Sequence, residues 1–193
     1  MSEEQIRFYF DFLCPYSYIA HLHLQRLLKD RNLSFAAYGV GLQNPMPGAP
    51  LALPNDSQAR WEKLSKRAQP LGITIKGPPG AIDSLLARRG LLRYQGISRQ
   101  EYVDGVFKAV FRDHIDINNT KALSNYLQAE GVDINPLHAA LADESTQGMC
   151  DDVAKLWEVR RLRMVPTIEI GEERACGLVE PRGLENLLAR VIY

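Results

Sequence analysis

Hydrophobic positions along the chain change their spacing several times, and each change marks an expected element. The first run, Ile6 to Phe12, is rich in aromatic residues and predicts a buried strand. Apolar residues then recur at helical spacing from Cys14 to Arg31, and Ser34 to Val40 predicts a second strand. Gly39 to Pro54 contains four prolines and three glycines and is expected to be a loop. The chain therefore begins as strand, helix and strand.

The stretch from residue 57 to residue 162 predicts mainly helices, separated by proline, glycine or asparagine. The expected helices cover residues 57–69, 82–95, 98–112, 119–129, a short segment from 135, and 146–162. Ser98 and Glu101 have the spacing of a capping box, and Asn118 or Asn119 is expected to cap the next helix. This part of the chain is expected to form a helical block.

The chain ends with strand and helix patterns again. Residues 167–171 and 174–177 predict two short strands, and residues 181–191 predict a closing helix. We expect a single α/β domain in which both ends of the chain share one sheet and the helical block is inserted between them. The expected sheet-forming parts are about 5–45 and 163–193, and the expected insertion is about 56–162.

Composition narrows the classes of function. The chain has 193 residues, 46% of them hydrophobic and 24% charged, with a formal net charge of zero. That length supports a substantial core, and zero net charge argues against nucleic acid as the main partner. No apolar stretch is long enough to span a membrane, and Met1 to Gln5 lacks a signal-peptide pattern. We expect a cytoplasmic protein with no membrane or nucleic-acid partner.

The strongest candidate for chemistry is the corner between the first strand and the first helix. Cys14 is followed by Pro15, a residue favoured at the first helical position, so Cys14 is expected near the N-cap. There the helix dipole and free N–H groups favour the thiolate, and we expect a Cys14 pKa below the ~8.5 of a free thiol. A thiolate is the nucleophile of disulfide exchange and covalent catalysis. The alternative is a buried structural cysteine, a common environment for this residue type.

The cysteines bear on the cellular compartment and on the chemistry at this corner. The chain has three cysteines, Cys14, Cys150 and Cys176. They fit a reducing compartment, and because no pair has metal-ligand spacing, we expect no metal. Cys176 either resolves a mixed disulfide on Cys14 or is a small core residue, and we favour the core.

Ser17 either hydrogen-bonds the thiolate or caps the helix, and Asp11 either tunes the thiol or is a polar residue at a strand end. His21 lies about 10 Å along the helix from Cys14, too far for a dyad within that helix.

Three segments together carry a resemblance to a known family. Phe8 to Tyr18 is Phe-Tyr-Phe-Asp-Phe-Leu-Cys-Pro-Tyr-Ser-Tyr, Val165-Pro166-Thr167 precedes the late strand, and Phe107 to Phe111 is followed by Asp116-Ile117. The chain resembles the DsbA-like thioredoxin-fold family, and within it the branch of 2-hydroxychromene-2-carboxylate isomerases and kappa-class glutathione transferases. The resemblance covers essentially the whole chain. It implies an α/β, thioredoxin-like fold with an inserted all-helical subdomain.

The resemblance also implies roles for the matching residues. Cys14 stands where this branch usually has a serine that faces the glutathione sulfur, and where disulfide oxidoreductases have their nucleophilic cysteine. Pro166 matches the family's cis-proline, and the backbone of Val165 is then expected to pair with the substrate. Pro15 and Tyr16 complete the binding motif, Tyr16 either flanking the substrate or being an exposed aromatic residue at the helix start. The implied cofactor is glutathione, and the implied assembly is a homodimer.

Two departures from the family pattern shape the functional hypothesis. Ser17 occupies the fourth position of the Cys-x-x-Cys motif, so the usual short disulfide cannot form there. Leu178 and Val179 stand where the branch holds the γ-glutamyl end of glutathione, which either changes the usual pose or abolishes binding. We expect a glutathione-linked thiol enzyme, with Cys14 and Ser17 catalytic, that isomerises or conjugates an electrophilic, aromatic small molecule. The alternatives are a monothiol disulfide oxidoreductase acting through mixed disulfides at Cys14, and a binding protein without chemistry.

Overall fold

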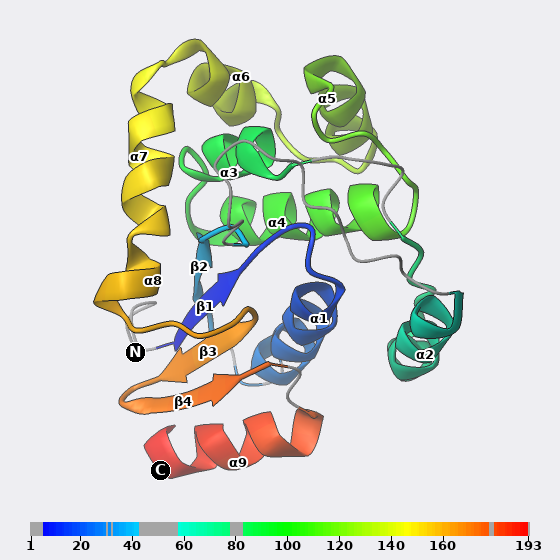
Figure 1. Ribbon diagram of the computed structural model, residues 1–193, viewed down its shortest axis with the longest axis vertical. Helices are drawn as coiled ribbons and strands as arrows, with labels where there is room; N and C mark the ends of the chain where they lie inside the picture. The colour runs from blue at the N-terminus through cyan, green and yellow to red at the C-terminus, as the bar shows by residue number, and fades with distance from the viewer. Residues whose placement is uncertain are drawn as a thin grey trace.

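A four-stranded mixed sheet forms the centre of the molecule (Figure 1). The computed structural model describes residues 6–29, 31, 33–42, 58–77, 83–177 and 180–192. The strand order is β2-β1-β3-β4. β1 (Ile6–Phe10) pairs in parallel with β2 (Ala36–Gly39) and antiparallel with β3 (Thr167–Ile170), and β3 pairs antiparallel with β4 (Glu173–Cys176). The two ends of the chain therefore share one sheet, as the sequence predicts.

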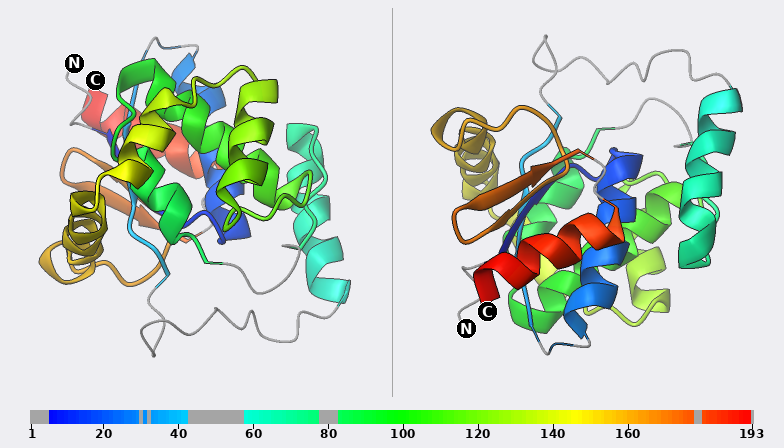
Figure 2. Two further views of the ribbon diagram at one scale, coloured as in Figure 1. Left: turned by 90° about the horizontal axis from the view of Figure 1, so that it is seen from above. Right: turned by 90° about the horizontal axis from the view of Figure 1, so that it is seen from below.

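Helices lie on both sides of this sheet. α1 (Pro15–Lys29) follows β1 and α9 (Pro181–Ile192) follows β4. The elements between β2 and β3 are α2 (Gln58–Ala68), the 3₁₀ turn η2 (Gln69–Leu71), α3 (Leu85–Leu91), α4 (Gly96–Phe111), α5 (Thr120–Ala129), α6 (Asn135–Ala142), α7 (Ser145–Ala154) and α8 (Leu156–Val159). The view from below in Figure 2 shows α1 and α9 on one side of the sheet and α7 with α8 on the other. None of the described helices is long and apolar enough to cross a membrane.

Side chains bond to the backbone at the start of two of the inserted helices. Asn119 caps α5, because its side-chain oxygen accepts a hydrogen bond from the Ala122 N–H at 3.1 Å, and this cap is one the sequence predicts. α3 covers only Leu85–Leu91 of the expected helix over 82–95, whose first residue lies outside the described residues. The Asp83 carboxylate accepts a hydrogen bond from the Leu85 N–H at 2.8 Å just before this helix.

Two other helical expectations are wrong in detail. The expected capping box at Ser98 does not form, because α4 already starts before this residue and the Ser98 hydroxyl donates to the Gln95 carbonyl at 2.8 Å. The expected helix over 146–162 is divided at Lys155 into α7 and α8. The short α8 carries Trp157, whose indole N–H donates to the backbone at the end of β2, a tertiary contact that local spacing does not reveal.

Aromatic side chains form the main core between the sheet, α1 and α4. The ring centroids of Phe8 and Phe10 lie 5.0 Å apart, and Phe107 lies 5.4 Å from Phe10 and 5.3 Å from Tyr18. All four rings are buried. Because side chains alternate along a strand, Phe8 and Phe10 enter this core, whereas Tyr9 points to the opposite face and joins a second cluster.

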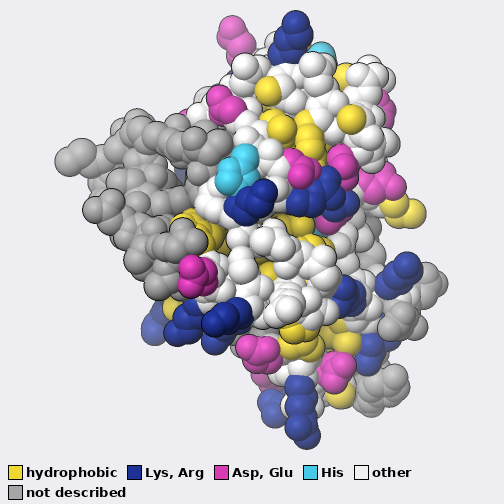
Figure 3. Space-filling view, turned by 90° about the vertical axis from the view of Figure 1, so that its right-hand side faces the viewer, with side chains coloured by type: hydrophobic (Ala, Val, Ile, Leu, Met, Phe, Trp, Pro, Cys, Tyr) yellow, Lys and Arg dark blue, Asp and Glu magenta, His cyan; other side chains and the backbone are white. Residues whose placement is uncertain are grey.

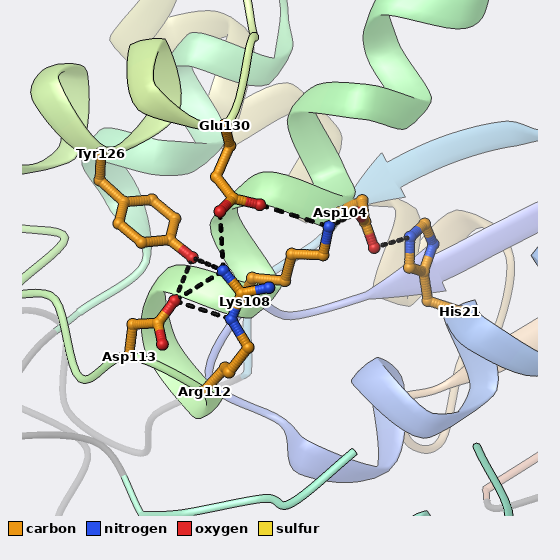
Figure 4. Close-up of polar contacts among 7 residues, drawn as sticks. All are labelled: His21, Asp104, Lys108, Arg112, Asp113, Tyr126 and Glu130. Carbon is orange, nitrogen blue, oxygen red and sulfur yellow. Dashed lines mark hydrogen bonds and ion pairs between the residues drawn. The ribbon is translucent and has the colours of Figure 1, made fainter. Parts of the chain in front are cut away.

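A chain of polar contacts connects α1 with α4 and α5 (Figure 4). Its members are His21, Asp104, Lys108, Arg112, Asp113, Tyr126 and Glu130. At its inner end, the fully buried His21 ring has no hydrogen-bond partner in the described structure, and its Nε2 lies 3.7 Å from Asp104 Oδ1. Burial lowers the pKa of His21, which favours the neutral ring. Lys108 then bridges Asp104 at 2.7 Å and Glu130 at 3.4 Å, so the contacts continue to the surface.

Candidate functional site

The predicted reactive corner lies where β1 turns into α1. Asp11 follows the strand, its Oδ1 accepts a hydrogen bond from the Leu13 N–H at 2.7 Å, and its carbonyl accepts one from the Cys14 N–H at 3.1 Å. Pro15 is the first residue of α1. The Cys14 carbonyl accepts a hydrogen bond from the Tyr18 N–H at 3.2 Å, the first of the helical pattern. Cys14 therefore occupies the N-cap position that the sequence predicts.

The Cys14 thiol faces the loop that precedes β3. Its S–H donates to the Val165 carbonyl, with Sγ 3.7 Å from the oxygen, so residues 151 positions apart meet at the sulfur. The peptide bond between Val165 and Pro166 is cis. The Gly177 N–H donates to the Pro166 carbonyl at 2.7 Å, which connects this loop to the end of β4. The structure thus brings together Cys14, Val165 and Pro166.

An apolar group of side chains, here called the Cys14 cluster, encloses the thiol. Its buried members are Tyr9, Cys14, Val40, Trp157, Leu162 and Val165. The Trp157 indole N–H donates to the Gly41 carbonyl at 3.0 Å, which holds α8 over the end of β2. The Tyr9 hydroxyl donates to the buried Glu169 carboxylate at 2.9 Å. Only 6% of Cys14 is exposed, so solvent has little access to the sulfur.

This enclosure reverses the expected acidity of the thiol. Burial raises the pKa of Cys14, because a thiolate loses its hydration inside the apolar cluster. The negative charge of Asp11 raises the pKa further, whereas the hydrogen bonds that Ser17 and the Tyr16 N–H offer to a thiolate lower it. The effect of burial on the Cys14 pKa outweighs the effect of the helix N-terminus, so the expected low pKa is wrong. The free protein therefore carries a protonated thiol at neutral pH.

Ser17 contributes a hydroxyl that is available inside this site. Its Oγ is fully buried and has no hydrogen-bond partner in the described part of the chain while Cys14 is protonated. Of the two roles left open for Ser17, its side chain does not take the capping one, and only its N–H bonds to the Cys14 carbonyl, at 2.9 Å. An unsatisfied buried hydroxyl costs about 1–3 kcal/mol. A thiolate or a ligand sulfur next to Cys14 would accept this hydrogen bond and remove the penalty.

A small basic hollow next to the corner is a feature that the sequence analysis missed. Tyr16, Lys63, Leu64 and Arg67 line a cavity of about 150 Å³ between the start of α1 and α2. Both basic side chains are exposed, and Arg67 lies 3.8 Å from Glu180. Figure 3 faces α2 and shows Lys and Arg side chains gathered on this part of the surface. The signal was available, because Lys63 and Arg67 are four residues apart and a helix places such residues on one face.

The remaining cysteines are not members of the Cys14 cluster. Cys14, Cys150 and Cys176 are all free thiols. Cys176 is exposed because β4 is an edge strand, so the expected core position is wrong, and its Sγ accepts a hydrogen bond from the Thr167 hydroxyl at 3.6 Å. Cys150 is buried on α7, and burial raises its pKa. Leu178 and Val179, which bear on glutathione binding, lie outside the described residues.

Comparisons with known proteins show what the chain is similar to over most of its length. The chain is 27% identical over 190 residues to a 2-hydroxychromene-2-carboxylate isomerase of Pseudomonas sp. (strain C18), covering 94% of this chain and 88% of the relative. A solved 2-hydroxychromene-2-carboxylate isomerase is similar with a TM-score of 0.78 and 24% identity, covering 97% of this chain and 95% of that one. The cytosolic disulfide reductase DsbM from Pseudomonas aeruginosa, solved with GSH, is similar with a TM-score of 0.67 and 15% identity, covering 97% and 96%. The family model described as a DSBA-like thioredoxin domain matches residues 5–189. The chain therefore belongs to the DSBA-like thioredoxin domain family.

Proposed function

We propose that this protein is a glutathione-linked thiol enzyme that isomerises or conjugates an electrophilic, aromatic small molecule. The observation that carries the proposal is the Cys14 thiol, enclosed at the start of α1 against the Val165 carbonyl. Ser17 in place of a second cysteine argues against a dithiol cycle at this motif. The isomerase names of two relatives support the isomerisation, and the GSH in the structure of the disulfide reductase DsbM supports glutathione as the ligand.

The protonated state of Cys14 favours a supporting role in this reaction. A neutral S–H can donate a hydrogen bond to the sulfur of bound glutathione, which favours the glutathione thiolate. The unpartnered Ser17 hydroxyl is a second donor at the same place. Glutathione is then the nucleophile: its sulfur forms a bond to an electrophilic carbon of the substrate. In an isomerisation that bond breaks again and the thiolate leaves, whereas in a conjugation it persists.

The surroundings of the corner offer contacts for both molecules. We assign the backbone of Val165 and Pro166, beside Pro15, to the peptide part of glutathione. The basic hollow of Tyr16, Lys63 and Arg67 suits one of its carboxylates, because both cations line the same cavity. The aromatic rings of the Cys14 cluster are suited to an aromatic substrate, since offset and edge contacts between rings are favourable.

Calorimetric titration of the reduced protein with reduced glutathione tests the proposal. We expect saturable binding that the double variant Lys63→Ala/Arg67→Ala weakens. Lys66→Ala is the matched control, because Lys66 is exposed on the same helix but does not line the hollow. Cys14→Ser should retain binding, since a hydroxyl replaces the thiol as donor. Heats equal to those of dilution in the wild type would contradict a glutathione-linked role.

A monothiol disulfide oxidoreductase is the second candidate. The cysteine at position 14 favours this candidate. A serine hydroxyl could donate the hydrogen bond that the first proposal requires, whereas disulfide exchange requires a thiol. The raised pKa of Cys14 counts against it, because the thiolate is the attacking species in disulfide exchange. Insulin reduction that depends on Cys14, with Cys14→Ser as the inactive control, would support this candidate. A Cys14 mixed disulfide after incubation with oxidised glutathione would support it further.

A further inference from the structure

The carboxylate of Asp11 lies directly behind the Cys14 corner and is 99% removed from solvent, with 1% exposed. Donors from three segments converge on it: the Leu13 N–H at 2.7 Å, the Leu42 N–H at 3.1 Å and the Ser84 hydroxyl at 2.6 Å. Asp11 is the acceptor in all three hydrogen bonds. One buried carboxylate therefore joins the turn before Cys14, the chain after β2 and the start of α3.

The Ser84 contact connects this carboxylate to the helical block. Ser84 directly precedes α3, and its hydroxyl donates to Asp11 while accepting a hydrogen bond from Arg88 Nε at 3.1 Å. The Arg88 guanidinium lies close to the chain after β2, since a Cβ atom at Gly41 would lie 3.0 Å from its Cζ. Gly41 also has a φ of 73°, so this close approach depends on glycine. The positive charge of Arg88 thus faces Asp11 through a single hydroxyl group.

Asp11 acts on Cys14 in two ways. Its contacts with the Leu13 and Cys14 N–H groups fix the turn that presents the thiol. Its negative charge adds to burial in raising the pKa of Cys14, because a like charge disfavours the thiolate. Three tyrosines also pack in the Cys14 cluster, and the buried Glu169 carboxylate accepts a hydrogen bond from the first of them. They are Tyr9, Tyr16 and Tyr38.

We propose that Asp11 is a positioning residue for Cys14: its buried carboxylate holds the turn that carries the thiol and places a negative charge behind it, and Ser84 of the helical block sets how strongly that charge acts. The proposal rests on Cys14 being the working thiol of the proposed function. It unites the two roles that the sequence leaves open for Asp11, the end of a strand and the tuning of a thiol. It also makes the docking of α3 a determinant of thiol reactivity.

The pH dependence of Cys14 alkylation by iodoacetamide tests this proposal. Trypsin places each cysteine in its own peptide, with Cys14 in residues 8–26, so mass spectrometry follows each thiol separately. Asp11→Asn should shift the midpoint of Cys14 alkylation to lower pH, because the charge is lost while the shape of the side chain is kept. Ser84→Ala should shift it to higher pH, because Asp11 loses a donor and its connection to Arg88. Asp83→Asn is the matched control, because it removes one negative charge beside Ser84. The Asp83 carboxylate accepts the Leu85 N–H rather than a group of the Cys14 turn, so the midpoint should stay unchanged.

Opposite shifts in the Asp11 and Ser84 variants support the proposal, and an Asp11→Asn midpoint at or above the wild-type value overturns it. Near-ultraviolet circular dichroism reports whether Asp11→Asn folds. If that variant does not fold, Ser84→Ala decides, and an unchanged or lowered midpoint overturns the proposal. The measurement uses neither glutathione nor substrate, so a protein that fails to bind glutathione would contradict the proposed function without affecting this result.

Discussion

The two faces of the sheet carry apolar clusters of different character. In the main core, beside α1, the Phe10 and Phe107 rings have no exposed surface and their centroids lie 5.4 Å apart. In the Cys14 cluster on the opposite face, Trp157 and Val165 are each 8% exposed, and Trp157 and Cys14 donate hydrogen bonds to backbone carbonyls. One face therefore carries a larger core closed to solvent, while the other carries a smaller cluster that encloses the Cys14 thiol.

Strand β1 contributes to both clusters because of its alternating side chains. Phe8 and Phe10 enter the main core, and Tyr9 between them enters the Cys14 cluster. A tightly packed core makes a thiol inert, whereas a partly exposed site in a polar setting makes it reactive. Cys14 lies between these limits, since its environment is apolar but 6% of the residue is still exposed.

The largest expected effect is on the main core, from Phe107→Ala. The ring packs against Phe10 and Tyr18, so its loss should lower the free energy of unfolding by about 3–5 kcal/mol. Urea denaturation measures this change. Ile97→Ala, which alters a side chain that is 78% exposed, is the control and should change stability by less than about 0.5 kcal/mol. Similar values for the two variants would contradict the placement of the main core.

The Cys14 cluster should respond differently to a comparable truncation, Leu162→Ala. Because Leu162 is 8% exposed and lies at the edge of a small cluster, we expect a loss near the lower end for buried leucines, about 2 kcal/mol. The same change should speed alkylation of Cys14 by opening its cover, while exposed Cys176 reacts at an unchanged rate. An unaltered Cys14 rate would show that the cover does not control access to the thiol.

The sequence predicted those features that depend on neighbouring residues. Apolar spacing located the strands and most helices, Asn119 was one of two expected caps for α5, and the Pro15 signal placed Cys14 near the N-cap. The direction of the Cys14 pKa could not be predicted, because it depends on Trp157 and other residues remote in the sequence that enclose the thiol. Local rules describe the helix start, but burial is a tertiary property.

A smaller effect is expected in the pH dependence of stability. Because burial raises the pKa of Cys14 in the folded state, the folded protein holds this proton more firmly than the unfolded chain does. The resulting stabilisation is complete below the unfolded thiol pKa of ~8.5 and is lost as pH rises from there towards the folded pKa. Urea denaturation across this range should show a steeper loss for the wild type than for Cys14→Ala. Parallel curves would contradict the raised pKa.

The smallest effect is expected from His21, which is buried against the rings of the main core. Burial lowers its pKa in the folded state, so the unfolded chain takes up a proton first as pH falls through ~6.5. The stability that this group supports is therefore present above that pH and is lost below it. Asp104 opposes the shift, which limits its size. His21→Leu should flatten the loss of stability between neutral and mildly acidic pH, and an equally steep loss in the variant would assign the effect to other groups.

Protection of Cys14 by a glutathione analogue is the most direct test of the central claim, that glutathione binds against the Cys14 cluster. The analogue is γ-glutamyl-2-aminobutyryl-glycine, in which a methyl group replaces the thiol, so that it cannot consume the alkylating reagent. Alkylation of Cys14 and Cys176 is followed in the same sample by peptide mass spectrometry. We predict that the analogue slows alkylation of Cys14 in a saturable way and leaves the rate at Cys176 unchanged. Equal rates at Cys14 with and without the analogue would contradict the account.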